Sequence, residues 1–135
     1  MAVLVDDQTL SGLLRQQTVW PRDRVFTSGH WYLRLCQAVF RGAGGALSKP
    51  LLSLPPSQQE AAIKAILELP DQVELLSWRE VAPVMASQLE GPGHGLNLLS
   101  REALAVATIL QAEVVIAPGN ENPLLRAALR QVGLS

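Results

Sequence analysis

The sequence predicts an α/β protein with a central, mainly parallel sheet and helices on both faces of that sheet. Short aliphatic runs at residues 2–5, 73–76 and 113–117 are typical of strands that are buried on both sides. The segments between them carry helix signals, so each strand is expected to be followed by a helical crossover. The chain has 135 residues, so we expect residues 1–135 to form a single domain.

The first part of the chain is expected to hold two strands and two helices. After the strand at residues 2–5, the pattern over residues 9–15 predicts the first helix. A short extended piece is expected at residues 25–26, after which Thr27 or Ser28 can cap a long helix.

This long helix should run to about Arg41 and should be mostly buried, because its polar side chains form one narrow stripe. The stripe consists of His30, Arg34, Gln37 and Arg41. Glycines and prolines then favour a long loop over residues 42–56.

Two Ser-x-x-Glu patterns predict the starts of further helices, since such a capping box satisfies backbone N–H groups at a helix start. The pattern at residues 57–60 opens a helix that should end near Pro70. The pattern at residues 77–80 opens another, which Pro83 should kink or restart.

The last two helices have their own terminal signals. Ser100 is expected to cap an alanine-rich helix over residues 101–110. Asn122 followed by Pro123 predicts the start of the final helix, and Gly133 is suited to end it.

The composition excludes several classes of protein. Eleven basic and twelve acidic side chains give a net charge of −1, which excludes nucleic-acid binding by bulk charge alone. Cys36 is the single cysteine, so intramolecular disulfides and thiolate zinc clusters are excluded. No basic signal segment or membrane-length apolar run is present, so we expect a cytoplasmic protein that contacts no membrane. Only 17% of the residues are charged, so we expect a homodimer or another protein partner.

Acidic and amide side chains follow two of the predicted strands. Asp6 and Asp7 come directly after the first strand, and Asn120 and Glu121 follow the last one. Ligands of parallel sheets collect at the carboxyl ends of the strands, so we expect these residues in one crevice. The carboxylates could hold a hard cation such as Mg²⁺; alternatively, one of the two aspartates caps the following helix.

Two glutamates leave similar alternatives open. Glu102 either joins Asp6 at a metal ion or complements the dipole in the first turn of its own helix. Glu121 either completes that metal site or is a solvated loop acid. Arg34 and Arg41 could bind the phosphates of an RNA backbone, although a solvated helix face explains them equally well.

The order of elements, a strand that ends at Val5-Asp6 and a following helix, resembles the opening of PIN-domain proteins. The stretch from Glu102 to Thr108, followed by the strand around residues 114–116, resembles the second signature of that family. The resemblance covers nearly the whole chain. It implies a PIN-like three-layer sandwich.

The resemblance also implies an activity. PIN domains are mostly ribonucleases that hold Mg²⁺ or Mn²⁺ with three or four carboxylates, and many small ones are toxins of toxin–antitoxin pairs. Asp6 matches the first acid of the family, and Glu102 matches the third. No acid is present near residues 32–34, where the second is expected, and Asn120 or Glu121 would have to replace the last.

Two main hypotheses follow. The first is a metal-dependent ribonuclease in which Asp6 and Glu102 are catalytic. Its substrate would be RNA, and its protein partner would be an antitoxin. Its metal ligands would be Asp6, Glu102, Glu121 and Asp7, and its substrate contacts Arg34, Arg41 and Asn120. The second is a catalytically degenerate PIN-like binding or regulatory subunit. A nucleotide- or phosphate-binding module is a third hypothesis, which rests on fold analogy alone.

Overall fold

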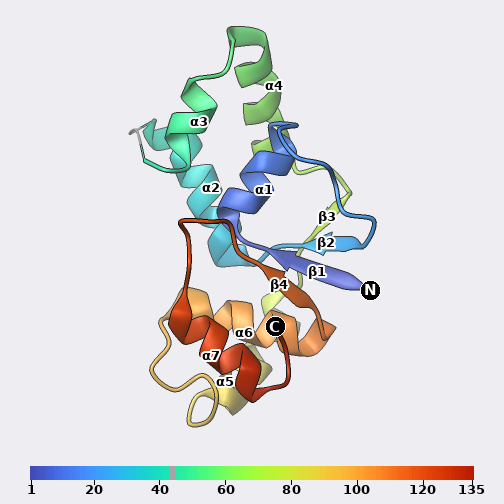
Figure 1. The fold of residues 1–135 in the computed structure, drawn as a ribbon, viewed down its shortest axis with the longest axis vertical. Coiled ribbons are helices and arrows are strands. Elements are labelled where there is room, and N and C mark those ends of the chain that lie inside the picture. The colour runs from blue at the N-terminus through green and yellow to red at the C-terminus, as the bar shows by residue number, and fades with distance from the viewer. Residues whose placement is uncertain (43–44) are drawn as a thin grey trace.

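The computed structural model describes residues 1–42 and 45–135, and it is an α/β structure (Figure 1). Its strands are β1 (Ala2–Val5), β2 (Arg24–Phe26), β3 (Val73–Glu74) and β4 (Glu113–Val115). Its helices are α1 (Asp7–Leu14), α2 (Gly29–Arg41), α3 (Ser48–Leu52), α4 (Pro56–Leu67), α5 (Trp78–Gln88), α6 (Leu98–Leu110) and α7 (Pro123–Gln131). None of the helices in these two described stretches is long and apolar enough to cross a membrane.

The four strands form one parallel sheet in the order β3-β2-β1-β4. β1 lies inside the sheet, where Leu4 is in register with Phe26 of β2 on one side and with Val114 of β4 on the other. Parallel neighbours need crossover connections, and helices supply them here. The predicted α/β class with a central parallel sheet is confirmed, although β3 and β4 each end two residues earlier than the sequence predicts.

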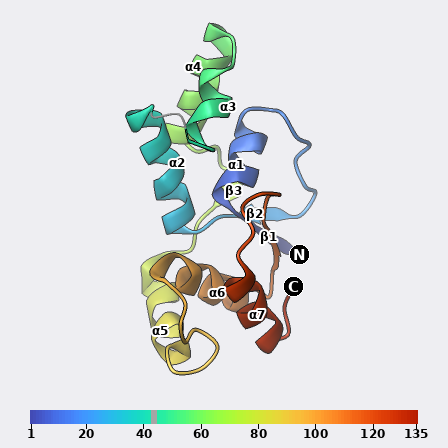
Figure 2. The same cartoon turned by 60° about the vertical axis from the view of Figure 1, so that its left-hand side comes forward.

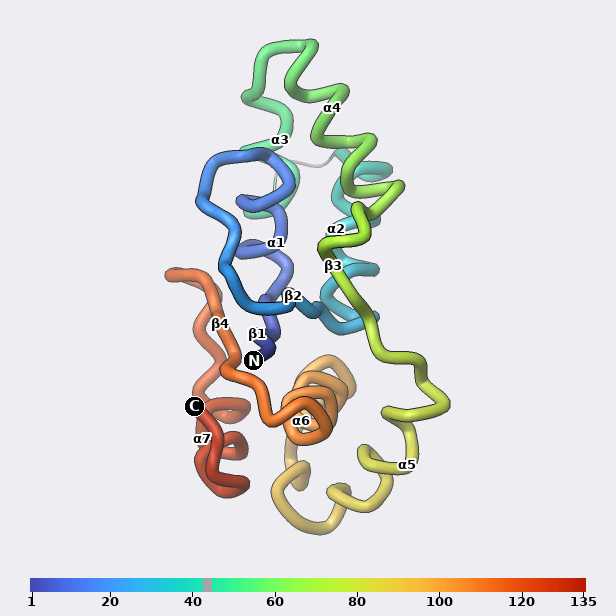
Figure 3. Tube along the Cα trace, turned by 90° about the vertical axis from the view of Figure 1, so that its right-hand side faces the viewer, coloured from blue at the N-terminus to red at the C-terminus, as the bar shows by residue number. Residues whose placement is uncertain are grey.

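Helices cover both faces of the sheet, so the molecule has three layers. Figure 2 shows α1, α2, α3 and α4 on one side of the strands and α5, α6 and α7 on the other, and Figure 3 shows the same division from another direction. Side chains of β1 alternate between the two layers: Val3 and Val5 pack into one core, and Leu4 packs into the other. Both faces of the strand are therefore apolar, which explains its continuous aliphatic sequence.

Several helix ends are those that the sequence predicts. Ser28 caps α2 by accepting a hydrogen bond from the N–H of Trp31 at 3.1 Å. Asn122 caps α7 by accepting one from the N–H of Leu125 at 3.2 Å. Gly133, with a φ of 79°, follows α7 in the left-handed conformation that favours glycine.

The predicted starts of α6 and α4 are wrong. α6 begins earlier than expected because Asn97, rather than Ser100, is its cap: the Asn97 side chain accepts a hydrogen bond from the N–H of Ser100 at 2.9 Å. α4 already begins at Pro56, before the pattern at residues 57–60. α5 begins at Trp78 with Ser77 in the capping position, as predicted, although neither Ser-x-x-Glu pattern forms a side-chain capping hydrogen bond. α5 runs through Pro83 without restarting.

α3 lies within the segment 42–56 that the sequence predicts to be a loop; residues 43–44 of that segment lie outside the described residues. Pro50 is the third residue of α3, where a backbone N–H would have no partner within the helix. Leu51 is buried, and the Ser48 hydroxyl donates to the carbonyl of Ala38 in α2 at 3.1 Å. Packing against the rest of the layer therefore overrides the local glycine and proline signals.

Candidate functional site

The order of the strands places a crevice at the carboxyl ends of β1 and β4. The chain runs from β1 to β2 on one side of β1, and β4 later pairs with the other side of β1. The strand order thus reverses between β1 and β4, and ligands of open parallel sheets collect at such a point. Asp6 and Asp7 follow β1, Asn120 follows β4, and Arg34 reaches the same place from α2. We call these four residues the switch-point cluster.

Asp6 is fully buried, and its carboxylate accepts three hydrogen bonds. Oδ1 accepts from the N–H of Thr9 at 2.8 Å and so caps α1. Oδ2 accepts from the N–H of Ala117 at 3.0 Å and from the side-chain amide of Asn120 at 2.6 Å. Asp6 therefore fills the capping role that the sequence left open, and it also ties the segment after β4 to the end of β1.

Asp7 is also fully buried, but its hydrogen bonds are fewer. Oδ1 accepts from the N–H of Gln8 at 2.8 Å and from the Asn120 amide at 3.0 Å. Oδ2 accepts no hydrogen bond from any residue that the structure describes. Nε of Arg34 lies 3.3 Å away, within ion-pair range but not aligned for a hydrogen bond. Burial raises the pKa of the Asp7 carboxyl above its usual value; the charge of Arg34 opposes this rise, and that of Asp6 adds to it.

Glu102 is buried beneath the N-terminus of α2. Its Oε1 accepts from the backbone N–H of His30 at 2.8 Å and lies 2.6 Å from Nδ1 of the same residue, a pairing that favours the Nδ1-protonated tautomer. Its Oε2 accepts from the N–H of Gly29 at 3.1 Å and from the indole N–H of Trp78 at 3.0 Å. The carboxylate thus satisfies two free N–H groups of α2 and offsets the positive end of its dipole. We call Glu102, Gly29, His30 and Trp78 the Glu102 cluster.

The position predicted for Glu102 within its own helix is wrong. α6 begins at Leu98, so Glu102 lies in the second turn, beyond the first turn in which a helix dipole acts most strongly. Glu102 instead complements the dipole of α2. Its contacts there are Gly29 and His30, which lie 73 and 72 residues before it in the sequence.

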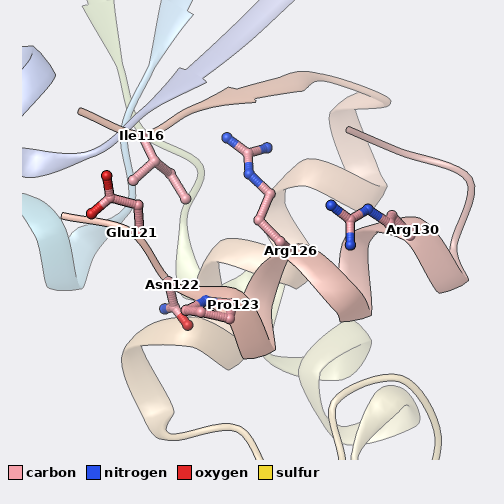
Figure 4. Close-up of a pocket in the computed structure, with 6 residues that line it drawn as sticks. All are labelled: Ile116, Glu121, Asn122, Pro123, Arg126 and Arg130. Atoms are coloured by element: carbon pink, nitrogen blue, oxygen red, sulfur yellow. The ribbon is translucent and has the colours of Figure 1, made fainter. Parts of the chain in front are cut away.

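A groove extends from the switch-point cluster to α7. One hollow of about 210 Å³ is lined partly by Arg34 and Asn120, and an adjoining hollow of about 250 Å³ is lined partly by Arg126 and Arg130. The two hollows share Ile116, Glu121 and Asn122. Figure 4 shows the second hollow between α7 and the segment that follows β4.

Two further predicted site residues lie away from the buried carboxylates. Arg41 is exposed at the last position of α2, about 10 Å of helix beyond Arg34. Glu121 is exposed in the groove, where its Oε1 accepts from the N–H of Gly119 at 2.9 Å, and this hydrogen bond holds the pKa of Glu121 below its usual value. Within the described part of the chain, no hydrogen bond joins Glu121 to Asp6.

The acids predicted to hold Mg²⁺ or Mn²⁺ do not form one ligand set. Within residues 1–42 and 45–135, no group of three or more His, Cys, Asp and Glu side chains is placed to hold a metal ion. Asp6 and Glu102 share no hydrogen-bond partner, and the roughly four acceptor positions of the Glu102 carboxylate face four donors of the protein. Oδ2 of Asp7 has no hydrogen-bond partner among the described residues. Binding of a metal ion next to Asp6 and Asp7 therefore stays a prediction.

Sequence reasoning missed residues at both ends of this region. The relation of Gly29 and Trp78 to Glu102 leaves no local signal, because it depends on how α2, α5 and α6 pack. Arg126 and Arg130 do have a signal: they lie one turn apart on α7, next to its buried face. That buried face consists of Leu125, Ala128 and Leu129.

Comparison with known proteins identifies no family for this chain, since no protein-family model and no curated protein matches it. The parallel sheet between two helical layers is consistent with a PIN-like three-layer sandwich. An architecture of this kind establishes a fold class, and function has to be argued from the site.

Proposed function

We propose that this protein is a PIN-like module that binds the sugar–phosphate backbone of RNA in the groove and does so without a catalytic metal ion. The observation that carries this proposal is that donors of the protein itself occupy the carboxylates of Asp6 and Glu102. A cation at Asp6 would have to displace the Asn120 amide or a backbone N–H. A cation at Glu102 would have to displace the N-terminus of α2.

The charges along the groove support an anionic ligand. Arg34, whose side chain is 48% exposed, lines the hollow beside the carboxylates, and Arg126 and Arg130 line the adjoining one. Guanidinium groups match the geometry of phosphate oxygens and are among the groups that contact the backbone of nucleic acids. The net charge of −1 means that such binding depends on this local group of arginines.

The buried aspartates act in this proposal by positioning the arginine. Asp7 lies beside Nε of Arg34, which leaves the two terminal nitrogens of the guanidinium for a ligand. Asn120 bridges Asp6 and Asp7 and so fixes the floor of the same hollow.

The test is fluorescence anisotropy of a labelled single-stranded RNA oligonucleotide in EDTA, between 50 and 200 mM salt. Three phosphate contacts predict a slope of about −2 when log K is plotted against log salt, and Arg34→Gln should reduce it to about −1.4. Arg79→Gln, which removes an exposed arginine of α5, is the matched control and should leave the slope unchanged. Absence of RNA binding at the lowest salt concentration would overturn the proposal.

A metal-dependent ribonuclease is the second candidate, favoured by one observation: Oδ2 of Asp7 is buried next to Asp6 and accepts no hydrogen bond. A bound Mg²⁺ or Mn²⁺ is one explanation for such an oxygen. Two results would favour this candidate: RNA cleavage that needs Mn²⁺, and a rise in melting temperature on addition of Mn²⁺. Asp7→Asn should then abolish both. The toxin role and the antitoxin partner that the resemblance implies would then be the next proposals to test.

A further inference from the structure

The hollow beside α7 has the features of a binding site in its own right. It encloses about 250 Å³ between α7 and the segment after β4. It is lined by Ile116, Glu121, Asn122, Pro123, Arg126 and Arg130. Figure 4 shows both arginine side chains on the same side of α7.

Among the described residues, no counter-charge lies within 4.0 Å of either guanidinium group. Across the described residues, the ion pairs within 4.0 Å are Arg24–Glu74, His30–Glu102 and Arg34–Asp7, so none of them involves Arg126 or Arg130. Like charges four residues apart on a helix repel each other, and an anion bound between them would remove that repulsion.

The position of Arg126 is unfavourable for the helix itself. Arg130 lies in the last turn of α7, where the dipole favours a cation. Arg126 is the fourth residue of the helix, at the positively charged end, and it is only partly exposed. Residues that break a local rule of this kind are expected at functional positions.

The only acid that lines this hollow, within the described residues, is directed elsewhere. Glu121 accepts a hydrogen bond from Gly119, and Figure 4 shows its carboxylate directed away from both arginines. Its negative charge lies at the rim and should weaken, without preventing, the binding of an anion near α7. Replacing it by glutamine should therefore strengthen anion binding.

We propose that this hollow binds the dianionic phosphate of a phosphate monoester between Arg126 and Arg130. Two guanidinium groups can make paired hydrogen bonds to phosphate oxygens and match a double negative charge. The hollow is smaller than the roughly 300–1,000 Å³ of sites that enclose a whole small molecule, so it suits a phosphate group whose remainder extends outside. This inference deepens the proposed function, which assigns the same two arginines to an RNA backbone, but it does not depend on the contact of Arg34.

The test is calorimetric titration of the full chain with adenosine 5′-monophosphate, with adenosine as the uncharged control. We expect the nucleotide to bind and adenosine not to bind, and Arg126→Gln and Arg130→Gln each to weaken binding about tenfold. Glu121→Gln should tighten binding by roughly threefold, a factor expected for removal of one screened charge. Arg79→Gln should change nothing.

Two further ligands identify the source of the phosphate. Inorganic phosphate that binds as tightly as the nucleotide would support the site and indicate a small free phosphate. Tighter binding of a 5′-phosphorylated dinucleotide than of its 5′-hydroxyl form would support the site and indicate the end of a nucleic acid strand. Absence of nucleotide binding overturns the proposal, as does binding that Arg34→Gln abolishes while both α7 variants keep it. The two proposals can fail separately: nucleotide binding that needs Arg126 and Arg130, found in a protein that binds no RNA in the anisotropy assay, would overturn the proposed function alone.

Discussion

Glu102→Gln separates the structural role of this acid from a catalytic one. The substitution keeps the shape of the side chain, but it replaces one acceptor oxygen by an NH₂ group that faces the donors at the N-terminus of α2. One or two of the four donors that meet Glu102 then lose their acceptor in a buried place, at about 1–3 kcal/mol each. Loss of the negative charge at the start of α2 adds up to about 2 kcal/mol.

We therefore expect Glu102→Gln to lower the free energy of unfolding by about 3–5 kcal/mol. In a chain of 135 residues, 1 kcal/mol corresponds to about 3.5 °C, so the melting temperature should fall by roughly 10–18 °C. The measurement is differential scanning calorimetry in EDTA, with urea unfolding as a second measure. Glu60→Gln removes an exposed glutamate of α4 and should stay within about 0.5 kcal/mol of the wild type. A melting temperature of Glu102→Gln within 2 °C of the wild type, a margin of roughly 0.6 kcal/mol, would refute the reasoning.

Gly29→Ala should destabilise the protein by about 1 kcal/mol although alanine favours helices, because its Cβ would lie 3.0 Å from Oε2 of Glu102; stabilisation in urea unfolding would contradict this. Because the pKa of Asp7 is raised in the folded protein, protonation of Asp7 stabilises the fold. This stabilisation is complete below about pH 3.9, the pKa of an unfolded aspartate, and it is lost as the pH rises through the folded-state pKa. The side chain of Asp7→Asn cannot ionise, so this variant does not lose that stabilisation. Thermal melts over a range of pH values should therefore show its stability, relative to that of the wild type, increasing as the pH rises. Asn120→Asp places a third acid beside the buried pair, so its melting temperature should fall in EDTA and recover with Mn²⁺; a variant without any response to Mn²⁺ would show that the cluster cannot hold an ion. The expected homodimer is tested by light scattering with Phe40→Ser, which removes a side chain that is 78% exposed on α2; an unchanged dimer would exclude this surface.

The sequence by itself determined the fold class and the meeting place of two site residues. β1 is buried on both faces, so its aliphatic run is continuous and typical of a parallel sheet. Parallel strands that end at one edge bring Asp6 and Asn120 together, and the structure shows a hydrogen bond of 2.6 Å between them. Ser28 and Asn122 were predictable as caps because a cap acts within three residues of chain.

Only the tertiary structure decided which partners the charged side chains have. α3 forms inside a predicted loop because Leu51 finds a buried place there, and Glu102 serves the N-terminus of α2 rather than that of its own helix. Asp7 is paired with Arg34, whereas Arg126 and Arg130 face a hollow. The physical reason is the range of each interaction along the chain. Strand burial and most caps depend on neighbours a few residues away, whereas hydrogen bonds that span 72 to 114 residues depend on how the layers pack.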